Sequence, residues 1–409
     1  MGLSCFFTCP ETIESHRLGI LGQFQDGFCD WLINQQYSAS TIYNYIPHIT
    51  HLSCFLRDLS LEDIEAINAS HIEAYFNQRF PPHYLKSAGY AYRCFLVYLK
   101  TLDIDLITPE QPLYQALIEQ YRQWCQHYKG LSPQTIHLRC QYLIKFIEVF
   151  GANNFQDRLS LITPKQVQST FLAFSKDKGV SWRRSMAATL KSFFQFCYKE
   201  GLTKQLISAA IPGIRTYRLA TIPKGISEKE AKILLASVDR TTCVGKRNYA
   251  LLIMLYYYGI RGAQIRALTL QDIDWQQETL YFSPIKSGNS IRVPLFEDVG
   301  NALLDYIRHA RVKTDHKEVF LTATAPYHPL YRSSNIGSII SDQLRKTKLD
   351  VPSKGSHLFR HGFATRMVNK GYSLKAIADV LGHKCIQTTQ QYSKVDFISL
   401  SQVPLEFPM

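Results

Sequence analysis

The chain has 409 residues, of which 46% are hydrophobic and 19% charged, and its formal net charge is +13. This composition indicates a globular protein long enough for two or three domains, and it excludes an apolar segment that could span a bilayer. The ten cysteines form no C-x-x-C pair, which argues against a zinc site and against a disulfide framework. The N-terminal residues lack the basic and apolar regions of a secretion signal, so we expect a cytoplasmic protein with no membrane partner.

The positive charge is unevenly distributed along the chain. Residues 1–105 contain 6 Lys and Arg against 11 Asp and Glu, which gives them a net charge of −5. Residues 106–221 contain 15 against 6 and residues 222–409 contain 25 against 16, so each of these parts carries +9. Because Lys and Arg neutralise phosphates when a protein binds nucleic acid, we expect an anionic partner to contact the later parts of the chain. Ribosomal and membrane-surface proteins are also basic, so charge alone does not identify that partner.

Residues 1–105 and 110–205 resemble two copies of one helical unit. Apolar residues recur at intervals of three and four in both, which predicts a bundle of about four helices in each. Trp31 and the Thr41-Ile42 pair correspond to Trp124 and the Thr135-Ile136 pair. Any two four-helix bundles share this period, but the shared Trp and S-x-x-T-I positions favour a repeat.

The second copy carries a basic group with an aromatic residue among it, whereas the first copy is acidic. A basic helical face with an interleaved aromatic side chain suits contacts with the phosphates of a duplex, and an ordinary solvated face is the alternative. The candidate DNA-binding residues are Lys176, Lys178, Trp182, Arg183, Arg184 and Lys191.

Residues 206–224 are interrupted by Pro and Gly and show no sustained period, so we interpret them as a linker. The following unit, residues 225–409, begins at Ser227, which is expected to cap a helix with an acidic first turn. A strongly apolar helix then stops at Gly259, just before Arg261. An arginine beside so much apolar sequence favours a buried anion site, with a solvated surface arginine as the alternative.

Two short extended runs follow, around a Lys-Ser-Gly-Asn-Ser sequence that begins at Lys286. Their composition and the Gly-Asn dipeptide predict a β-hairpin. Lys286 lies at the end of this hairpin, where its side chain can reach a bound ligand.

Three patterns lie close together near the C-terminus: His357-Leu-Phe-Arg360, Leu381-Gly382-His383, and Tyr392 nine residues later. On a helix, His357 and Arg360 share one face. Arginine binds oxyanion charge, histidines transfer protons and tyrosine supplies an attacking oxygen. Each pattern alone is common, but their order and spacing predict a site that acts on a phosphodiester.

On these residues the chain resembles the tyrosine recombinase family, the phage-integrase and Xer-like enzymes. The matching positions are Arg261 in Gly-Ile-Arg, Lys286 in the hairpin, His357, Arg360, His383 and Tyr392. The resemblance implies a mainly α fold with a small β-hairpin sheet in a catalytic domain over 225–409, after two helical bundles. It also implies that residues 110–205 are a core-binding domain. The chain departs from the family at Gln264, where members usually carry an acidic residue, and this puts the reaction rate in doubt.

The resemblance further implies a site-specific recombinase that cleaves and rejoins DNA through a covalent 3′-phosphotyrosine at Tyr392. In this chemistry the arginines bind the non-bridging oxygens, Lys286 protonates the leaving 5′-oxygen, and His383 holds the scissile phosphate. His357 and the surrounding arginine charge are the candidates for activating Tyr392. No metal and no cofactor are implied. The implied partners are double-stranded DNA, three further copies of the chain in a tetramer on paired sites, and accessory DNA-bending or directionality factors at the nucleoid.

Two other functions stay open at this point. One is a type IB topoisomerase-like enzyme that nicks and reseals a single duplex, and the other is a DNA-binding protein that has kept the fold and lost the chemistry. The target DNA and the biological role (integration, transposition or resolution) also stay open. For the acidic first bundle, a contact with a neighbouring subunit is favoured over a narrow DNA contact, because its charge is opposite to that of the adjacent bundle.

Overall fold

The computed structural model describes residues 2–61, 63–78, 81–104, 106, 114–151, 155–215, 225–285, 289–330, 334–351 and 355–395. The described elements are helices and one three-stranded antiparallel sheet, which confirms the predicted mainly α fold with a small sheet. The chain divides into two compact units, one with residues 1–17, 22–50 and 219–409 and the other with residues 18–21 and 51–218. The four segments expected from the sequence stay a prediction.

The described secondary structure of the N-terminal part consists of helices, as its apolar spacing predicts. The buried side chains of Phe28 and Leu32, one turn apart, give α2 its apolar face. The helices are η1 (Gly2–Cys5), α1 (Pro10–His16), η2 (Gly22–Phe24), α2 (Gln25–Asn34), α3 (Ala39–Asp58), η3 (Ile64–Ala66), α4 (Ala69–Phe76) and α5 (Pro82–Lys100).

The next helices surround a core of their own. They are α6 (Gln115–Lys129), α7 (Pro133–Gly151), α8 (Phe155–Arg158), η4 (Leu159–Leu161), α9 (Pro164–Ser175), α10 (Val180–Lys199) and η5 (Ile207–Ala210). The aromatic residues Trp124, Phe146 and Phe193 lie in this core. The core extends into the segment read as a linker, because Ile207 and Ile211 are also buried in it.

The start of a long helix has the same local geometry in both helical parts. The hydroxyl of Ser38 lies 2.8 Å from that of Thr41 at the start of α3. The hydroxyl of Ser132 lies 2.9 Å from that of Thr135 at the start of α7. Ser and Thr at a helix start satisfy groups that lack an intrahelical partner, so the repeated S-x-x-T sequence has the same structural role twice.

The two corresponding tryptophans also have matching neighbours. Trp31 stacks on Phe28 with ring centroids 6.2 Å apart, and Trp124 stacks on Tyr121 at 6.2 Å. In both cases the partner precedes the tryptophan by three residues, which places the two rings on one face of a helix. These contacts support the reading of the two parts as copies of one unit.

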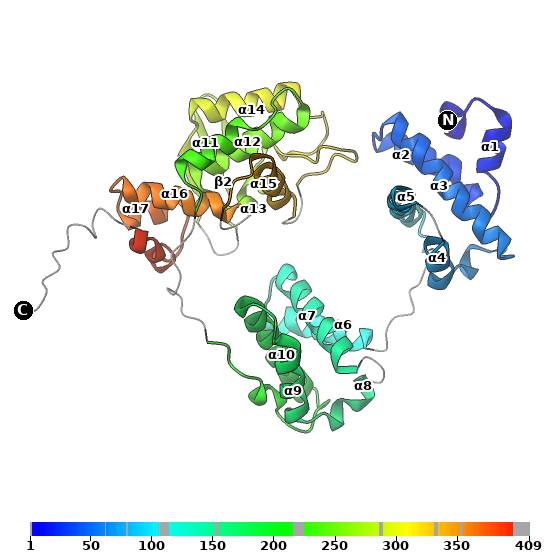
Figure 1. Ribbon diagram of the computed structural model, residues 1–409, viewed down its shortest axis with the longest axis horizontal. Coiled ribbons are helices and arrows are strands. Elements are labelled where there is room, and N and C mark those ends of the chain that lie inside the picture. Colours follow the sequence, from blue (N-terminus) through cyan, green and yellow to red (C-terminus); the bar gives the residue numbers. More distant parts are fainter. Residues whose placement is uncertain are drawn as a thin grey trace, which may run out of the picture. The chain divides into compact units, whose positions relative to one another are not determined.

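The C-terminal part contains α11 (Glu228–Ala236), α12 (Cys243–Tyr258), α13 (Gly262–Ala267), η6 (Leu270–Asp272), β1 (Ile273–Asp274), β2 (Thr279–Phe282), β3 (Ile291–Pro294), α14 (Glu297–His309), α15 (Ser334–Thr347), α16 (His357–Asn369), α17 (Leu374–Val380), η7 (Ile386–Thr388) and η8 (Gln390–Val395). Helix α12 is central, because residues 250–255 are all buried. It packs against α14 and α16 (Figure 1).

The sheet has the strand order β1-β2-β3, and β2 pairs with β3 in an antiparallel register that places Leu280 opposite Val293. Phe282 and Ile291 form the next buried pair on the same face. This alternation of buried and outward residues is what a strand with one covered face requires. The predicted β-hairpin is therefore confirmed, and β1 adds a short third strand.

Helix α16 contributes to two apolar clusters. Its first turn places Leu358 and Phe359 in the large core around α12. One turn later, Phe363 and Ala364 lie in a smaller cluster that also contains Tyr392. The helix is thus fixed on both sides, and the polar residues between these apolar ones are held at defined positions.

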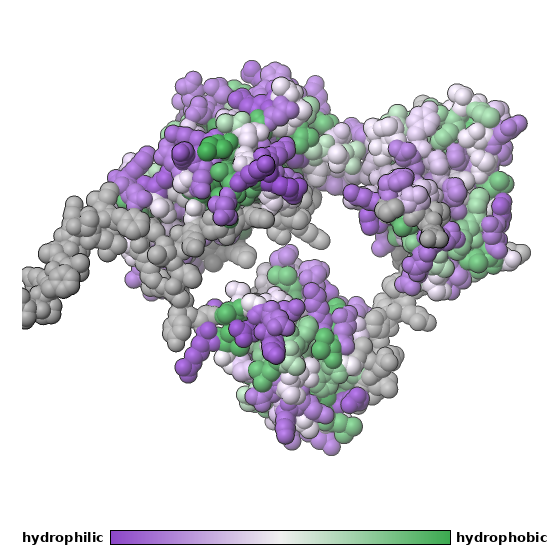
Figure 2. Space-filling view, in the orientation of Figure 1, coloured by the Kyte–Doolittle hydropathy of each residue, from purple (hydrophilic) through white to green (hydrophobic). Residues whose placement is uncertain are grey.

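Hydrophilic side chains prevail on the visible face of the C-terminal part. Figure 2 shows hydrophilic side chains spread over the visible face of the C-terminal part, with smaller hydrophobic groups among them. Of the helices in the described ranges, none is both long and apolar enough to cross a membrane.

Candidate active site

Arg360 lies at the centre of the candidate site and is 3% exposed. One Nη atom donates to the carbonyl oxygen of Gly259 at 3.0 Å, and the other donates to that of Leu381 at 2.9 Å. The second Nη atom also lies 2.6 Å from Nε2 of His383. Arg360 therefore connects the ends of α12 and α17 to α16. Burial, and then the charge of Arg261, lower the pKa of Arg360 to about 10, so it still carries its charge at neutral pH.

Arg261 precedes α13, where the left-handed Gly259 has ended α12. Its backbone N–H donates to Oε1 of Gln264 at 3.1 Å, so Gln264 supplies the acceptor that starts the helix. Arg261 is half-buried, and burial lowers the pKa of its guanidinium. An amide oxygen performs this capping as a carboxylate would, but it adds no negative charge beside Arg261.

His383 follows Gly382, whose φ of +62° ends α17 in the left-handed region. Its Nδ1 lies 2.6 Å from the hydroxyl oxygen of Thr389, and its Nε2 is bound by Arg360. Because a guanidinium has only donors, Nε2 accepts, and the ring proton lies on Nδ1 and is donated to Thr389. Burial, Arg360 and Arg261 lower the pKa of His383 to about 4. The imidazole is therefore neutral at physiological pH.

Tyr392 lies on η8 and is 1% exposed. Its ring packs in the small cluster with Phe363 and Leu381. Its hydroxyl oxygen lies 2.8 Å from Nδ1 of His361. Burial raises the pKa of Tyr392 to about 12, and the charge of Arg360 opposes this effect. The phenol is therefore fully protonated at neutral pH.

The structure brings most of the residues expected from the sequence into one region. Arg360 contacts His383 directly. Partial burial of the His357 ring lowers its pKa although the residue stays accessible to solvent, and the charges of Arg360 and Arg261 lower it further. His357 is exposed at the start of α16. Lys286 lies outside the described residues.

His361, the residue that contacts the tyrosine, was not among the site residues predicted from the sequence. A usable signal was present, because His361 follows His357 by four residues and so lies on the same helix face. The two imidazole rings have centroids 6.1 Å apart. Burial lowers the pKa of His361, and the charges of His357 and Arg360 add to this effect.

The predicted DNA-binding residues cluster on and between α9 and α10. Lys176 and Lys178 are exposed at the turn between the helices, and the other basic residues lie on α10. Trp182 packs edge-on against Tyr142 and Phe174 with centroids 5.7 and 5.3 Å apart. Its half-buried ring packs against the core of this part, and Nζ of Lys178 lies 6.0 Å from its centroid.

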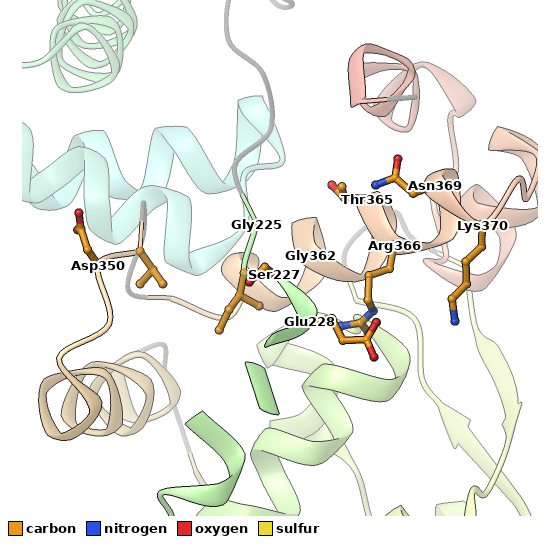
Figure 3. A pocket seen from close by; sticks show the side chains of 11 residues that line it. Gly225, Ser227, Glu228, Asp350, Gly362, Thr365, Arg366, Asn369 and Lys370 are labelled. Carbon is orange, nitrogen blue, oxygen red and sulfur yellow. The ribbon is translucent and has the colours of Figure 1, made fainter. Parts of the chain in front are cut away.

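A cavity of about 810 Å³ lies between residues 225–228, at the start of the C-terminal part, and the second half of α16. Figure 3 shows Glu228 and Arg366 pointing toward each other at its wall. Arg366 is further held by a hydrogen bond of 2.6 Å to the carbonyl oxygen of Tyr256. The lining residues are Gly225, Ile226, Ser227, Glu228, Asp350, Val351, Gly362, Thr365, Arg366, Asn369 and Lys370. The site residues around Arg360 do not line this cavity.

Across the described ranges, no group of three or more His, Cys, Asp or Glu side chains could hold a metal ion.

Comparison with known sequences gives a consistent set of relatives. Residues 224–398 match the model of the phage integrase family. The putative integrase/recombinase y4rA of Sinorhizobium fredii (strain NBRC 101917 / NGR234) is 30% identical over 388 residues, which cover 93% of this chain and 93% of that protein. The tyrosine recombinase XerC of Bacillus pumilus (strain SAFR-032) is 26% identical over 304 residues, which cover 72% of this chain and 95% of that protein.

Solved structures with a similar fold come from the same group of proteins. The XerH site-specific recombinase bound to palindromic difH substrate aligns with a TM-score of 0.52 at 16% identity, over 70% of this chain and 93% of that one. A lambda integrase dimer bound to a core site aligns with a TM-score of 0.52 at 16% identity, over 68% of this chain and 94% of that one. At this identity the two structures show a shared fold.

Proposed function

Because this chain belongs to the phage integrase family of tyrosine recombinases, which break and rejoin DNA, we propose that Tyr392 is its nucleophile. Strand cleavage then leaves a covalent 3′-phosphotyrosine. The observation that supports this proposal is the position of the Tyr392 hydroxyl, 2.8 Å from a residue of the helix that carries Arg360. Tyr392 also lies close enough for the charge of Arg360 to lower its pKa.

The other site residues have roles that follow from their chemistry. Arg261 and Arg360 offer charge-assisted donors to the non-bridging oxygens, on which charge develops during attack. His383 helps to hold the scissile phosphate through Arg360, whose Nη atom its Nε2 accepts from, and Lys286 protonates the leaving 5′-oxygen. The phosphotyrosine conserves the energy of the broken bond, so rejoining requires neither ATP nor a metal.

The site must open before it can act. Arg360 is 3% exposed and Tyr392 is 1% exposed, so a phosphodiester cannot contact either side chain in this conformation. Tyr392 is carried by the short 3₁₀ helix η8, next to the end of the described chain. A shift of η8 that admits the phosphate and keeps the Tyr392 hydroxyl within reach of His361 is the simplest such change.

The proposed substrate is double-stranded DNA in the cytoplasm, at the nucleoid. A XerH structure and a lambda integrase structure contain DNA sites, which supports the same class of substrate here. Residues 110–205 act as the core-binding domain, residues 206–224 as the linker and residues 225–409 as the catalytic domain. The basic residues near α10 contact phosphates, and four copies assemble on paired sites.

The test is a covalent trapping assay on a duplex that is first selected, from a random-sequence pool, for binding to the full chain. The selected duplex is nicked near the cleavage position so that the released strand diffuses away. Wild type should accumulate a protein–DNA adduct, whereas Tyr392→Phe should bind the DNA equally well and form none. An adduct with Tyr392→Phe would refute the assignment. Exchange of strands between two such duplexes separates a recombinase from an enzyme that only relaxes supercoils.

A further inference from the structure

We propose that His361 is the catalytic proton acceptor for Tyr392. This inference rests on the proposed function of Tyr392 as nucleophile. Nδ1 of His361 lies 2.8 Å from the tyrosine hydroxyl, and the two rings have centroids 5.7 Å apart. A nucleophile and a base within hydrogen-bond reach of each other are the diagnostic arrangement of nucleophilic catalysis.

The neighbouring histidines are less suited to this role. Both ring nitrogens of His383 are occupied, one by Arg360 and the other by Thr389. His357 is exposed, and its ring centroid lies 6.1 Å from that of His361, on the side of the helix start. His361 is thus the histidine whose nitrogen is aligned with the hydroxyl that reacts.

The surroundings favour a neutral imidazole at His361. Burial lowers its pKa, and the charges of His357 and Arg360 lower it further. A neutral ring that carries its proton on Nε2 has a free lone pair at Nδ1 and can accept the phenolic proton.

The proton transfer fits a balanced cleavage step. The Tyr392 oxygen forms a bond to phosphorus while its proton moves to Nδ1 of His361. The bond from phosphorus to the 5′-oxygen breaks, its electron pair goes to that oxygen, and the oxygen takes a proton from Lys286. When the strands rejoin, a 5′-hydroxyl attacks phosphorus and gives its proton back to Lys286, and the imidazolium returns its proton to the tyrosine oxygen as the phosphotyrosine bond breaks.

A second reading of the same contact makes an opposite prediction. If the hydrogen bond only held Tyr392 in a resting position, its removal would free the hydroxyl, and cleavage would be at least as fast as in wild type. If His361 takes the proton, removal slows cleavage. General base catalysis contributes about a hundredfold to ten-thousandfold in rate, so the two readings are well separated.

The experiment measures single-turnover adduct formation by the full chain on the selected, nicked duplex. His361→Phe keeps the volume of the ring and removes the acceptor. His361→Asn places an amide oxygen near the position of Nδ1, which accepts a hydrogen bond but cannot hold a proton. Both variants should bind the duplex with wild-type affinity and cleave it at least about a hundredfold more slowly. His309→Asn, at a side chain that is 64% exposed on α14, is the matched control and should cleave at the wild-type rate.

Each contrary outcome identifies what failed. A wild-type rate in His361→Asn would show that His361 only positions Tyr392. An unchanged or faster rate in His361→Phe would show that His361 only holds Tyr392 in a resting position. Either result overturns the proposal. If both variants lose rate and DNA binding together, the loss is structural and the proposal is also rejected. An adduct formed by Tyr392→Phe overturns the proposed function itself. Loss of that adduct together with a full rate in His361→Phe overturns this inference alone.

Discussion

Arg360 and His383 are joined directly, with an Nη atom of the arginine 2.6 Å from Nε2 of the histidine. Both side chains could carry positive charge, and they can lie this close only because His383 is neutral and accepts the bond. Thr389 holds the other nitrogen of His383 and so fixes the tautomer. The charge of the site is therefore concentrated on the guanidinium groups, where a phosphate would bind.

We expect Arg360→Lys to be nearly as defective as Arg360→Ala. Lysine keeps the charge. Its single ammonium cannot bind the carbonyl oxygens of Gly259 and Leu381 and a phosphate at once, whereas the planar guanidinium of arginine has enough donors for all three. Loss of the donors at a developing oxyanion costs about 3–4 kcal/mol, roughly a hundred- to thousandfold in cleavage rate. Single-turnover cleavage measures the effect, with Arg308→Lys at an exposed position of α14 as the control. Full activity of Arg360→Lys would contradict a role in clamping the phosphate.

We expect the C-terminal part to lose stability in acid because of His383. Its pKa is about 4 in the folded chain against a usual value of 6.5, so the unfolded chain binds the proton first as pH falls. The stabilisation is complete above about pH 7 and declines between pH 6.5 and 4. At about 1.4 kcal/mol per pKa unit, the total loss is about 3 kcal/mol. His357 and His361 act in the same direction.

Amide hydrogen exchange in α17 and η8 would measure this loss locally, after correction for the intrinsic effect of pH on exchange. His383→Gln retains an acceptor and a donor but no titratable group. The opening free energy of the variant should therefore fall less than that of wild type between pH 7.5 and 5. Equal declines in the two proteins would show that His383 is not responsible.

Lys286 can be tested by chemistry although it lies outside the described residues. If it protonates the leaving 5′-oxygen, Lys286→Ala should be strongly impaired on normal DNA. A substrate with sulfur at the 5′-bridging position should restore cleavage, because a thiolate leaves without a proton. Equal defects on the two substrates would assign Lys286 to DNA binding instead.

Gly362→Ala should destabilise the catalytic part. A Cβ atom at Gly362 would lie 2.4 Å from the carbonyl oxygen of Ile226, so the backbone of one segment must retreat. Overpacking of this kind costs about 1–3 kcal/mol. Gly337→Ala on α15 is the control, since nothing lies within 4 Å of its added Cβ. In thermal unfolding the control should gain about 0.5–1 kcal/mol from its lower backbone entropy, and the same result for Gly362→Ala would disprove the close packing.

Local signals in the sequence predicted much of this part of the fold. Gly259 and Gly382 both adopt left-handed conformations at the helix ends expected for them, and Ser373 caps α17 through the N–H of Ala376. The two short extended runs and the Gly-Asn dipeptide between them predicted the hairpin. These features depend on residues close together in the chain, so a sequence reading can identify them.

Features that depend on distant residues were harder to predict. Nothing in the sequence indicated that the half-buried Trp182 would pack against Phe174 and Tyr142, and its role in DNA binding stays a prediction. The role of His361 depends on Tyr392 reaching back to α16 from 31 residues away. Side-chain patterns also gave no sign that carbonyl oxygens of two other helices would hold Arg360.

The entry of the chain into the catalytic part is tied to the helix that carries the site. The N–H of Ile226 donates to the carbonyl oxygen of Leu358 at 3.2 Å, within the first turn of α16. Gly225 touches the same helix so closely that an added Cβ would lie 2.1 Å from the nitrogen of Gly362. Mechanical load on the chain before residue 225 therefore acts on α16 through the backbone. A pull at this point would strain the helix between Leu358 and Gly362, where Arg360 and His361 lie, without any contact to the reacting atoms.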